Sequence, residues 1–218
     1  MIMRSRAEIS SLLTNPGIIA VVRARRPDQV LPLSEALIAG GVNAIEITMT
    51  TPNALEAIRE AREKLGARGL IGVGTVLGAE TCRAALEAGA EFVVTPILRV
   101  ELVEIAHAAR RPIMLGTYTP TEAQLAHEAG ADFVKIFPAD GLGPGYIKAL
   151  RGPLPHLRIV PTGGVDVNTA GEFLRAGCVA LGVGSSLISA AILRENRWDE
   201  LTRAARALRE VVEQARGQ

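Results

Sequence analysis

Aromatic side chains are scarce in this chain, at 3% of its 218 residues. Proteins that bind single-stranded nucleic acid by stacking its bases need such side chains, so we expect no site of that kind. The chain also lacks an excess of either charge, because 24 Lys and Arg stand against 23 Asp and Glu, for a net charge of +1. This balance gives no general attraction to nucleic acid or to an anionic membrane. Any anionic ligand must therefore be held by local features.

Metal-type and disulfide-type patterns are missing as well. The two cysteines, Cys82 and Cys178, lie far apart in the chain, and the three histidines share no metal spacing. Two isolated cysteines make no disulfide framework and are typical of buried thiols in a reducing cytosol. We therefore expect no bound metal.

Long apolar runs are also absent, since none approaches the length of a membrane span. The first 14 residues mix Arg, Glu and Ser with apolar residues. That mixture predicts an amphipathic helix rather than a signal peptide, which needs an uninterrupted apolar core. We expect a cytoplasmic protein without a membrane partner.

A repeated pattern is present instead, and the 48% of hydrophobic residues that carry it suit buried parallel strands. In four segments a helical stretch ends at Ala-Gly, and an apolar strand follows after a few residues. The segments are residues 36–49, 85–95, 126–137 and 173–183. Their capping glycines, which recur every 41 to 49 residues, are Gly40, Gly89, Gly130 and Gly177. That spacing is long enough for two strand–helix units per repeat.

Four further apolar runs fill the spaces between the repeats, at residues 18–23, 70–76, 113–117 and 158–162. Helix starts are expected at Pro27-Asp28, Thr51-Pro52, Thr119-Pro120 and Asp166. Eight apolar strands that alternate with helices, without a break in composition, predict an α/β fold. We expect one (β/α)8 barrel domain over residues 1–218, with an N-terminal helix. An open doubly wound sheet is the alternative.

Lys135 lies in the middle of the sixth predicted strand. The chain has only three lysines, so a lysine inside a buried strand indicates chemistry that arginine cannot perform. An amine removed from water is more often neutral and nucleophilic near neutral pH, whereas arginine stays charged and forms no Schiff base. The alternative is a purely structural ion pair with Glu46, although buried pairs usually cost more than they return.

Polar side chains also occur toward the carboxyl ends of other strands, where such barrels carry their chemistry. Glu46, at a depth similar to that of Lys135, could act as a general acid and base or only as a counter-ion. Arg23 could clamp a carboxylate or phosphate or be a solvated strand end. Threonines occupy comparable positions on the second, third and seventh strands, at Thr48, Thr50, Thr75 and Thr162.

Two glycine-rich loops follow the last two predicted strands, at residues 162–166 and 182–186. Glycines let backbone N–H groups approach an anion closely. The loops after the seventh and eighth strands are the recurrent phosphate site of such barrels. The two loops together therefore predict a phosphate site.

Eight motifs fall in order along the chain, on all but one of the predicted strand ends. They are AVVRA (20–24), IEIT (45–48), GVGTV (72–76), VTP (94–96), TPTE (119–122), VKIFPA (134–139), PTGGV (161–165) and GVGS (182–185). With these motifs the chain resembles the 2-keto-3-deoxy-6-phosphogluconate / 4-hydroxy-2-oxoglutarate aldolase family over nearly its whole length. The resemblance implies a class I aldolase on a TIM barrel, usually a homotrimer, that acts on a small keto acid without a metal or organic cofactor.

The resemblance also implies residue roles. Lys135 would form the Schiff base with the C2 carbonyl, and Glu46 would shuttle protons through a water molecule. The residues implied around the pyruvate half are Arg23, Thr75, Pro96, Phe137 and Thr162. Those implied at the phosphate are Gly163, Gly164, Gly184 and Ser185.

Two positions depart from some family members. Thr50 stands where several members carry an arginine that contacts substrate, although others also have threonine. We keep Thr50 among the expected substrate contacts and leave the substrate preference open. Leu115 stands where a proline before Gly116 is frequent.

The leading functional hypothesis is cleavage of 2-keto-3-deoxy-6-phosphogluconate to pyruvate and glyceraldehyde 3-phosphate. Alternatives within the family are cleavage of 4-hydroxy-2-oxoglutarate to pyruvate and glyoxylate, or of 2-keto-3-deoxy-6-phosphogalactonate. A phosphate-binding isomerase or epimerase would share the barrel and the glycine loops but would need no lysine nucleophile. A non-catalytic binding barrel is disfavoured because it would be expected to lose the inward Lys135 and Glu46.

Overall fold

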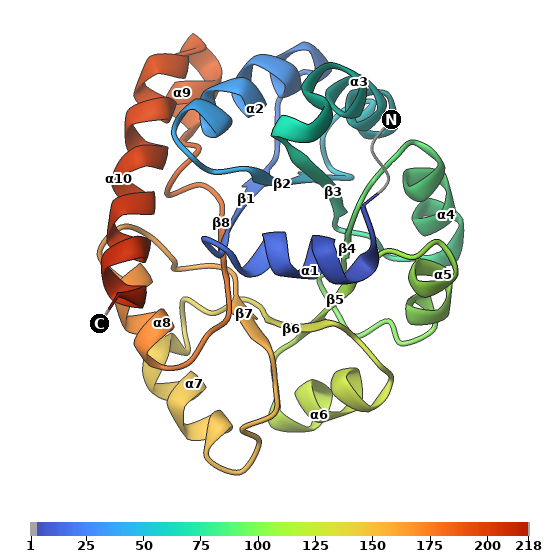
Figure 1. Cartoon of the computed structure of the whole chain (residues 1–218), viewed down its shortest axis with the longest axis vertical. Coiled ribbons are helices and arrows are strands. Elements are labelled where there is room, and N and C mark those ends of the chain that lie inside the picture. Colours follow the sequence, from blue (N-terminus) through green and yellow to red (C-terminus); the bar gives the residue numbers. More distant parts are fainter. Residues whose placement is uncertain (1–3, 218) are drawn as a thin grey trace.

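The strands form one parallel sheet that curls into a barrel (Figure 1) in this computed structural model, which describes residues 4–217. Their order is β7-β6-β5-β4-β3-β2-β1-β8, and a parallel bridge between Thr162 and Gly182 joins the two ends of that order. In chain order the strands are β1 (Ile18–Val22), β2 (Ala44–Thr48), β3 (Leu70–Gly74), β4 (Val93–Val94), β5 (Ile113–Thr117), β6 (Phe133–Ile136), β7 (Ile159–Pro161) and β8 (Leu181–Val183). The predicted (β/α)8 barrel is confirmed.

Helices surround the barrel, and α1 lies across one of its ends (Figure 1). They are α1 (Arg6–Thr14), α2 (Val30–Ala39), α3 (Ala54–Leu65), α4 (Ala79–Glu87), α5 (Leu102–Ala108), α6 (Pro120–Glu128), α7 (Gly143–Arg151), α8 (Ala170–Arg175), α9 (Ala190–Glu195) and α10 (Trp198–Arg216), with the 3-10 turns η1 (Pro27–Gln29) and η2 (Gly66–Arg68). Within residues 4–217, every helix is too short or too polar to cross a membrane.

Side chains of the strands alternate between two cores, because successive residues of a strand point to opposite faces. One core lies between the strands and the surrounding helices. The other fills the barrel, and its strand residues are Ile19, Ala44, Leu70, Val94, Met114, Phe133 and Val160. Glu46 and Lys135 follow Ala44 and Phe133 by two residues, so they share the inward face.

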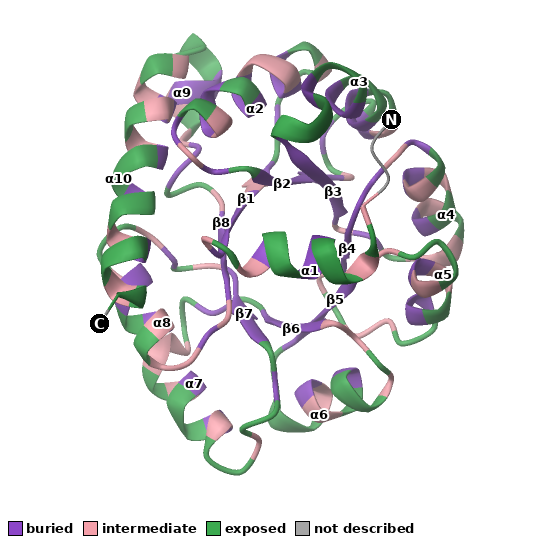
Figure 2. Cartoon of the chain, viewed as in Figure 1, coloured by how far each residue is buried: buried purple, intermediate pink, exposed green. Residues whose placement is uncertain are grey.

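Helix α1 closes the amino-terminal end of the barrel. Its Ile9 and Leu13 are buried against the inward residues at the strand starts, and the strands beneath it are mostly buried (Figure 2). Just before the helix, Arg4 Nη1 lies 3.0 Å from the Glu91 carboxylate, which also contacts Arg62 Nη1 at 2.7 Å. Glu91 is completely buried, so apolar packing and paired charges together seal this end.

Several strands end earlier than the sequence indicates. Strand β1 stops at Val22, β3 at Gly74 and β7 at Pro161. Arg23, Thr75 and Thr162 therefore follow their strands rather than ending them. At Thr75 the reason is local, since its φ of 60° is left-handed and interrupts the extended backbone.

The helix start expected at Thr119 is confirmed, and the one at Thr51 is wrong. Thr119 caps α6, where its hydroxyl accepts from Glu122 N–H while the Glu122 carboxylate accepts from Thr119 N–H. Helix α3 instead begins at Ala54. The Thr51 hydroxyl is engaged elsewhere, because it accepts a 3.2 Å hydrogen bond from Ala24 N–H across the barrel edge.

Candidate active site

Lys135 occupies the interior of the barrel, as its mid-strand position predicts. It lies within β6 and is 4% exposed. Its Nζ is 4.9 Å from the centroid of the Phe137 ring. The amine is thus held in a confined, partly apolar site, which suits a nucleophile better than a solvated charge does.

Glu46 reaches the same interior from β2, and it is 2% exposed. Its Oε1 is buried without a hydrogen-bond partner within residues 4–217. Burial raises the pKa of this carboxyl above its ordinary value, while the positive charges of Lys135 and Arg23 act in the opposite direction. A shift in this direction makes the carboxyl a better candidate for both giving and taking a proton during a reaction.

The structural ion pair considered as an alternative for Lys135 is not formed. Among the ion pairs of the described residues, none joins Glu46 to Lys135 directly, although the two charges attract each other. The two side chains are close enough for their charges to interact. This arrangement favours chemistry over a purely structural role.

Inward-facing glycines make space for larger neighbouring groups inside the barrel, and the sequence alone did not assign these glycines a role. A Cβ on Gly74 would collide with Oε1 of Glu46, and one on Gly182 would collide with the Thr162 hydroxyl. A Cβ on Gly116 would run into the backbone of Pro96 and Ile97, with Ile97 N at 2.6 Å. Each glycine lies opposite a larger group of a neighbouring strand or loop, and only the packed structure shows that pairing.

A cavity of about 770 Å³ opens above the inward pair at the carboxyl ends of β1, β6, β7 and β8. Seven of the predicted site residues line it: Arg23, Phe137, Thr162, Gly163, Gly164, Gly184 and Ser185. Lys135 and Glu46 lie deeper and do not line it, but the Phe137 ring that does so is the one beside the Lys135 amine. Phe137 therefore connects the cavity to the reactive centre.

Three predicted site residues, Thr50, Thr75 and Pro96, lie outside that lining. They follow β2, β3 and β4 on the other side of the barrel mouth. Thr50 is exposed, and its hydroxyl is 2.8 Å from that of Thr48, which in turn donates to the Val22 carbonyl. Thr50 is therefore positioned at the rim.

The two glycine-rich loops meet as predicted at one side of the cavity. Gly163 and Gly164 have φ values of 93° and 68°, conformations that favour glycine. The Ser186 hydroxyl donates a 2.6 Å hydrogen bond to the Val165 carbonyl and so links the two loops. Gly184 and Ser185 complete the wall, which brings all four predicted phosphate residues together.

Other notable positions have structural explanations. Leu115 is fully buried in the core between the barrel and the helices, so the departure from proline there does not touch the cavity. Burial raises the pKa of Cys82 to about 11 and that of Cys178 to about 12, which makes both thiols unreactive near neutral pH. Residues 4–217 contain no group of three or more His, Cys, Asp or Glu that could hold a metal ion.

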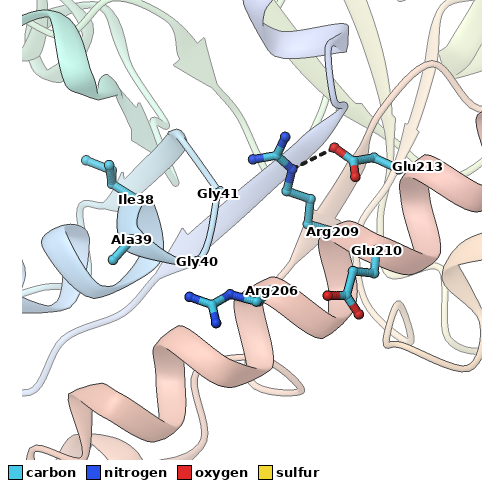
Figure 3. Close-up of a pocket in the computed structure, with 8 residues that line it drawn as sticks. All are labelled: Ile38, Ala39, Gly40, Gly41, Arg206, Arg209, Glu210 and Glu213. Atoms are coloured by element: carbon cyan, nitrogen blue, oxygen red, sulfur yellow. Dashed lines mark hydrogen bonds and ion pairs between the residues drawn. The ribbon is translucent and has the colours of Figure 1, made fainter.

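A smaller cavity, of about 260 Å³, lies outside the barrel between the end of α2 and the side of α10 (Figure 3). An ion pair from Arg209 Nε to Glu213 Oε1, 2.7 Å long, borders it. Its walls contain Gly40, Gly41 and charged side chains of α10 but no lysine, cysteine, serine or histidine that could act as a nucleophile. This cavity therefore offers no group for the expected Schiff-base chemistry.

Comparisons with known proteins agree with this arrangement. The family model described as KDPG and KHG aldolase matches residues 9–204. A 2-dehydro-3-deoxy-phosphogluconate aldolase of Pseudomonas aeruginosa is 37% identical over 92% of this chain and 91% of its own length. A 2-dehydro-3-deoxy-6-phosphogalactonate aldolase of Escherichia coli is 35% identical over 92% and 98%.

A solved structure shows a similar fold with a bound intermediate. It is a KDPG aldolase of Legionella pneumophila with pyruvate captured as a covalent carbinolamine. It superposes with a TM-score of 0.85 at 27% identity, over 92% of this chain and 97% of that one.

Proposed function

The chain belongs to the KDPG and KHG aldolase family, and we propose that it cleaves 2-keto-3-deoxy-6-phosphogluconate to pyruvate and glyceraldehyde 3-phosphate through a Schiff base on Lys135. The family and its relatives are aldolases, and so lyases. The observation that carries the residue assignment is the amine of Lys135, buried inside the barrel beneath a cavity with glycine loops at its mouth.

The neutral amine of Lys135 attacks the C2 carbonyl of the keto acid, and the resulting carbinolamine loses water to give an iminium ion. The electron pair of the C3–C4 bond then moves toward the iminium nitrogen while the C4 hydroxyl loses its proton, which releases the aldehyde. The enamine that remains is protonated at C3. Water then adds to the iminium carbon and frees pyruvate, so Lys135 is regenerated.

Glu46 is the group that moves these protons. No other carboxylate of the described chain combines an inward position, burial and an unpartnered oxygen beside Lys135. Its raised pKa lets one carboxyl act as base when the C4 hydroxyl loses its proton and as acid when the enamine gains one. Arg23, at the cavity wall and within electrostatic range of Glu46, is placed to hold the substrate carboxylate.

Trapping with borohydride tests this proposal directly. Incubation with pyruvate and borohydride should add a reduced pyruvyl group to the peptide that contains Lys135, which peptide mapping by mass spectrometry would detect. Lys64 and Lys148 are exposed and serve as internal controls. Labelling at Lys148 or Lys64 instead, or no labelling, would contradict the assignment.

Cleavage of related keto acids is the second candidate function, and the side chain of Thr50 is the reason to consider it. An uncharged side chain at this rim position provides no fixed cation for one particular sugar acid. Relatives at similar identity are named for the gluconate and the galactonate compounds. Measuring kcat/KM for both epimers and for 4-hydroxy-2-oxoglutarate would rank them.

We also propose a homotrimer in the cytoplasm. Exposed apolar side chains follow three neighbouring strands, β3, β4 and β5, namely Leu77, Ile97, Val100 and Tyr118. Apolar side chains at these positions suit a contact between subunits, and the family resemblance implies three copies. Light scattering coupled to gel filtration would test the stoichiometry, and Ile97→Glu should shift the protein toward monomer.

A further inference from the structure

Three arginines follow β1 within four residues, and the proposed mechanism uses only Arg23. Arg26 is engaged with Asp28, since its Nε and Nη2 donate to that carboxylate at 3.0 and 3.2 Å. It does not line the cavity. Arg25 does line the cavity, and no hydrogen bond or ion pair holds it within residues 4–217.

The backbone that carries Arg25 is anchored. Ala24, between Arg23 and Arg25, is 3% exposed and belongs to the core behind the barrel. Its N–H donates to the buried hydroxyl of Thr51. The guanidinium of Arg25 therefore extends from a fixed point of the cavity wall rather than from a free loop.

Strand pairing places this point beside the glycine loops. Strand β1 pairs with β8, with Ala20 opposite Val183. Because the strands are parallel, the chain after β1 and the chain after β8 leave the barrel at the same edge. A Cβ on Gly184 would lie in ordinary contact, 3.9 Å, with that of Val21. Arg25 thus lies on the side of the cavity that holds Gly184 and Ser185.

Among the charged residues that line the cavity, Arg25 is the cation for which the proposed mechanism has no role. Asp166 is the one carboxylate among the lining residues, and it already accepts from the N–H groups of Asn168 and Thr169 at 2.8 and 2.9 Å. Those hydrogen bonds hold the pKa of Asp166 below its ordinary value, so it stays ionised in its own turn. Arg23 is coupled to Glu46 at the reactive end.

We propose that Arg25 is a specificity-determining residue, whose guanidinium binds the phosphate of the substrate beside the N–H groups of the glycine loops. This inference rests on the proposed function. Backbone N–H groups and Ser185 supply hydrogen bonds but no full positive charge. A forked guanidinium supplies both to a dianion, and so favours phosphorylated over unphosphorylated keto acids.

The kinetic test compares Arg25→Gln, Arg25→Lys and the matched control Arg26→Gln. Loss of a charge-assisted hydrogen bond should lower kcat/KM for 2-keto-3-deoxy-6-phosphogluconate by about tenfold or more in Arg25→Gln. The effect should appear mainly in KM and should be much smaller for 4-hydroxy-2-oxoglutarate, which has no phosphate. Arg25→Lys should recover part of the loss, and Arg26→Gln should behave like the parent.

A binding measurement separates this inference from the proposed function. Calorimetric titration with inorganic phosphate, which needs no turnover, should give a Kd about tenfold weaker in Arg25→Gln than in the parent and in Arg26→Gln. Equal losses on both substrates, or an unchanged phosphate Kd, would overturn the role of Arg25. If the parent instead fails to trap pyruvate but binds phosphate through Arg25, the aldolase assignment fails and the anion site remains.

Discussion

Two buried carboxylates occupy opposite ends of the barrel, and their surroundings differ in kind. Glu91, at the end closed by α1, is fully buried and contacts both Arg4 and Arg62 within 3.0 Å. Glu46 is buried almost as completely, yet its Oε1 has no hydrogen-bond partner in the described part of the chain. One carboxylate is matched by fixed charges, whereas the other is left able to exchange a proton.

The difference shows which end of the barrel lowers the stability of the fold. An unpartnered buried carboxyl costs free energy, and a fold selected for stability alone would pair or remove it. The barrel instead pairs its charges at the closed end and keeps an unsatisfied acid beside a buried amine at the open end. Such a concentration of unfavourable features is typical of a reactive site.

The largest expected effect comes from Lys135→Arg, which keeps the charge at the open end and removes the nucleophile. Arginine cannot form the imine, so kcat should fall at least about 10⁴-fold on every substrate. Steady-state assays with phosphorylated and unphosphorylated keto acids would measure it. Substantial residual cleavage in a variant shown to be folded by circular dichroism would mean that another group is the nucleophile.

The second prediction exchanges the two carboxylates for amides in turn. Glu46→Gln should lower kcat by roughly 10² to 10⁴-fold, the usual contribution of a positioned acid or base, with little loss of stability. Glu91→Gln should leave the buried Arg62 and the partly buried Arg4 without their counter-charge and cost about 3 kcal/mol of unfolding free energy. Activity per folded molecule should survive in that variant. Urea denaturation and steady-state kinetics on both variants would measure these losses. If both variants lost the same activity and the same stability, the two carboxylates would not differ in role.

A third prediction concerns pH. The native pKa of Glu46 is raised from its ordinary value of 4.5, so the native state holds this proton longer than the unfolded chain does. The resulting stability is fully present below that ordinary value and is lost as pH rises through the higher native pKa. Glu46→Gln escapes this loss. Relative to the parent, the variant should therefore gain unfolding free energy as pH rises above 4.5, and the gain should level off above the native pKa of Glu46. A loss of unfolding free energy in the variant over this range would mean that the charges of Lys135 and Arg23 lower the pKa of Glu46 more than burial raises it.

The smallest expected effect is at the loops. Gly184 has space for a methyl group, because a Cβ there would make only an ordinary van der Waals contact. Gly163 has a φ of 93°, at which any residue with a side chain would be strained. Gly184→Ala should therefore fold normally and, if the loop holds the phosphate, lower kcat/KM several-fold more for the phosphorylated substrate. Gly163→Val should show the same preference with an added loss of stability. Equal losses on both substrates in the folded alanine variant would argue against a phosphate at this wall.

The sequence could predict the barrel and the depth of Lys135, because both depend on local periodicity. Apolar strands, helix caps and the position of a residue within a strand are all visible in a few neighbouring residues. The space around Glu46 could not be predicted in the same way. It depends on Gly74 lying opposite that side chain, and strand register across the barrel sets this pairing.

Glu91 was missed for the same physical reason. Its partners are Arg4, 87 residues away, and Arg62, and no local pattern joins the three. The error at Thr51 is similar, because a residue that would cap a helix locally instead accepts a hydrogen bond from Ala24 N–H, in the segment that follows β1. The role of a side chain cannot be predicted from its sequence neighbours when its partners are distant in the chain.

The packing of Ile9 and Leu13 also determines the route by which substrate enters the barrel and products leave it. With the amino-terminal end closed, one opening serves both for arrival and for departure. Under the proposed function, the pyruvate half is bonded to Lys135 at the bottom, and the phosphorylated half lies nearer the exit. The aldehyde must then depart before pyruvate, and in the condensation direction pyruvate must arrive before the aldehyde. A helix that takes no part in the chemistry thereby directs both halves through the barrel mouth, in the order that the covalent bond to Lys135 already requires.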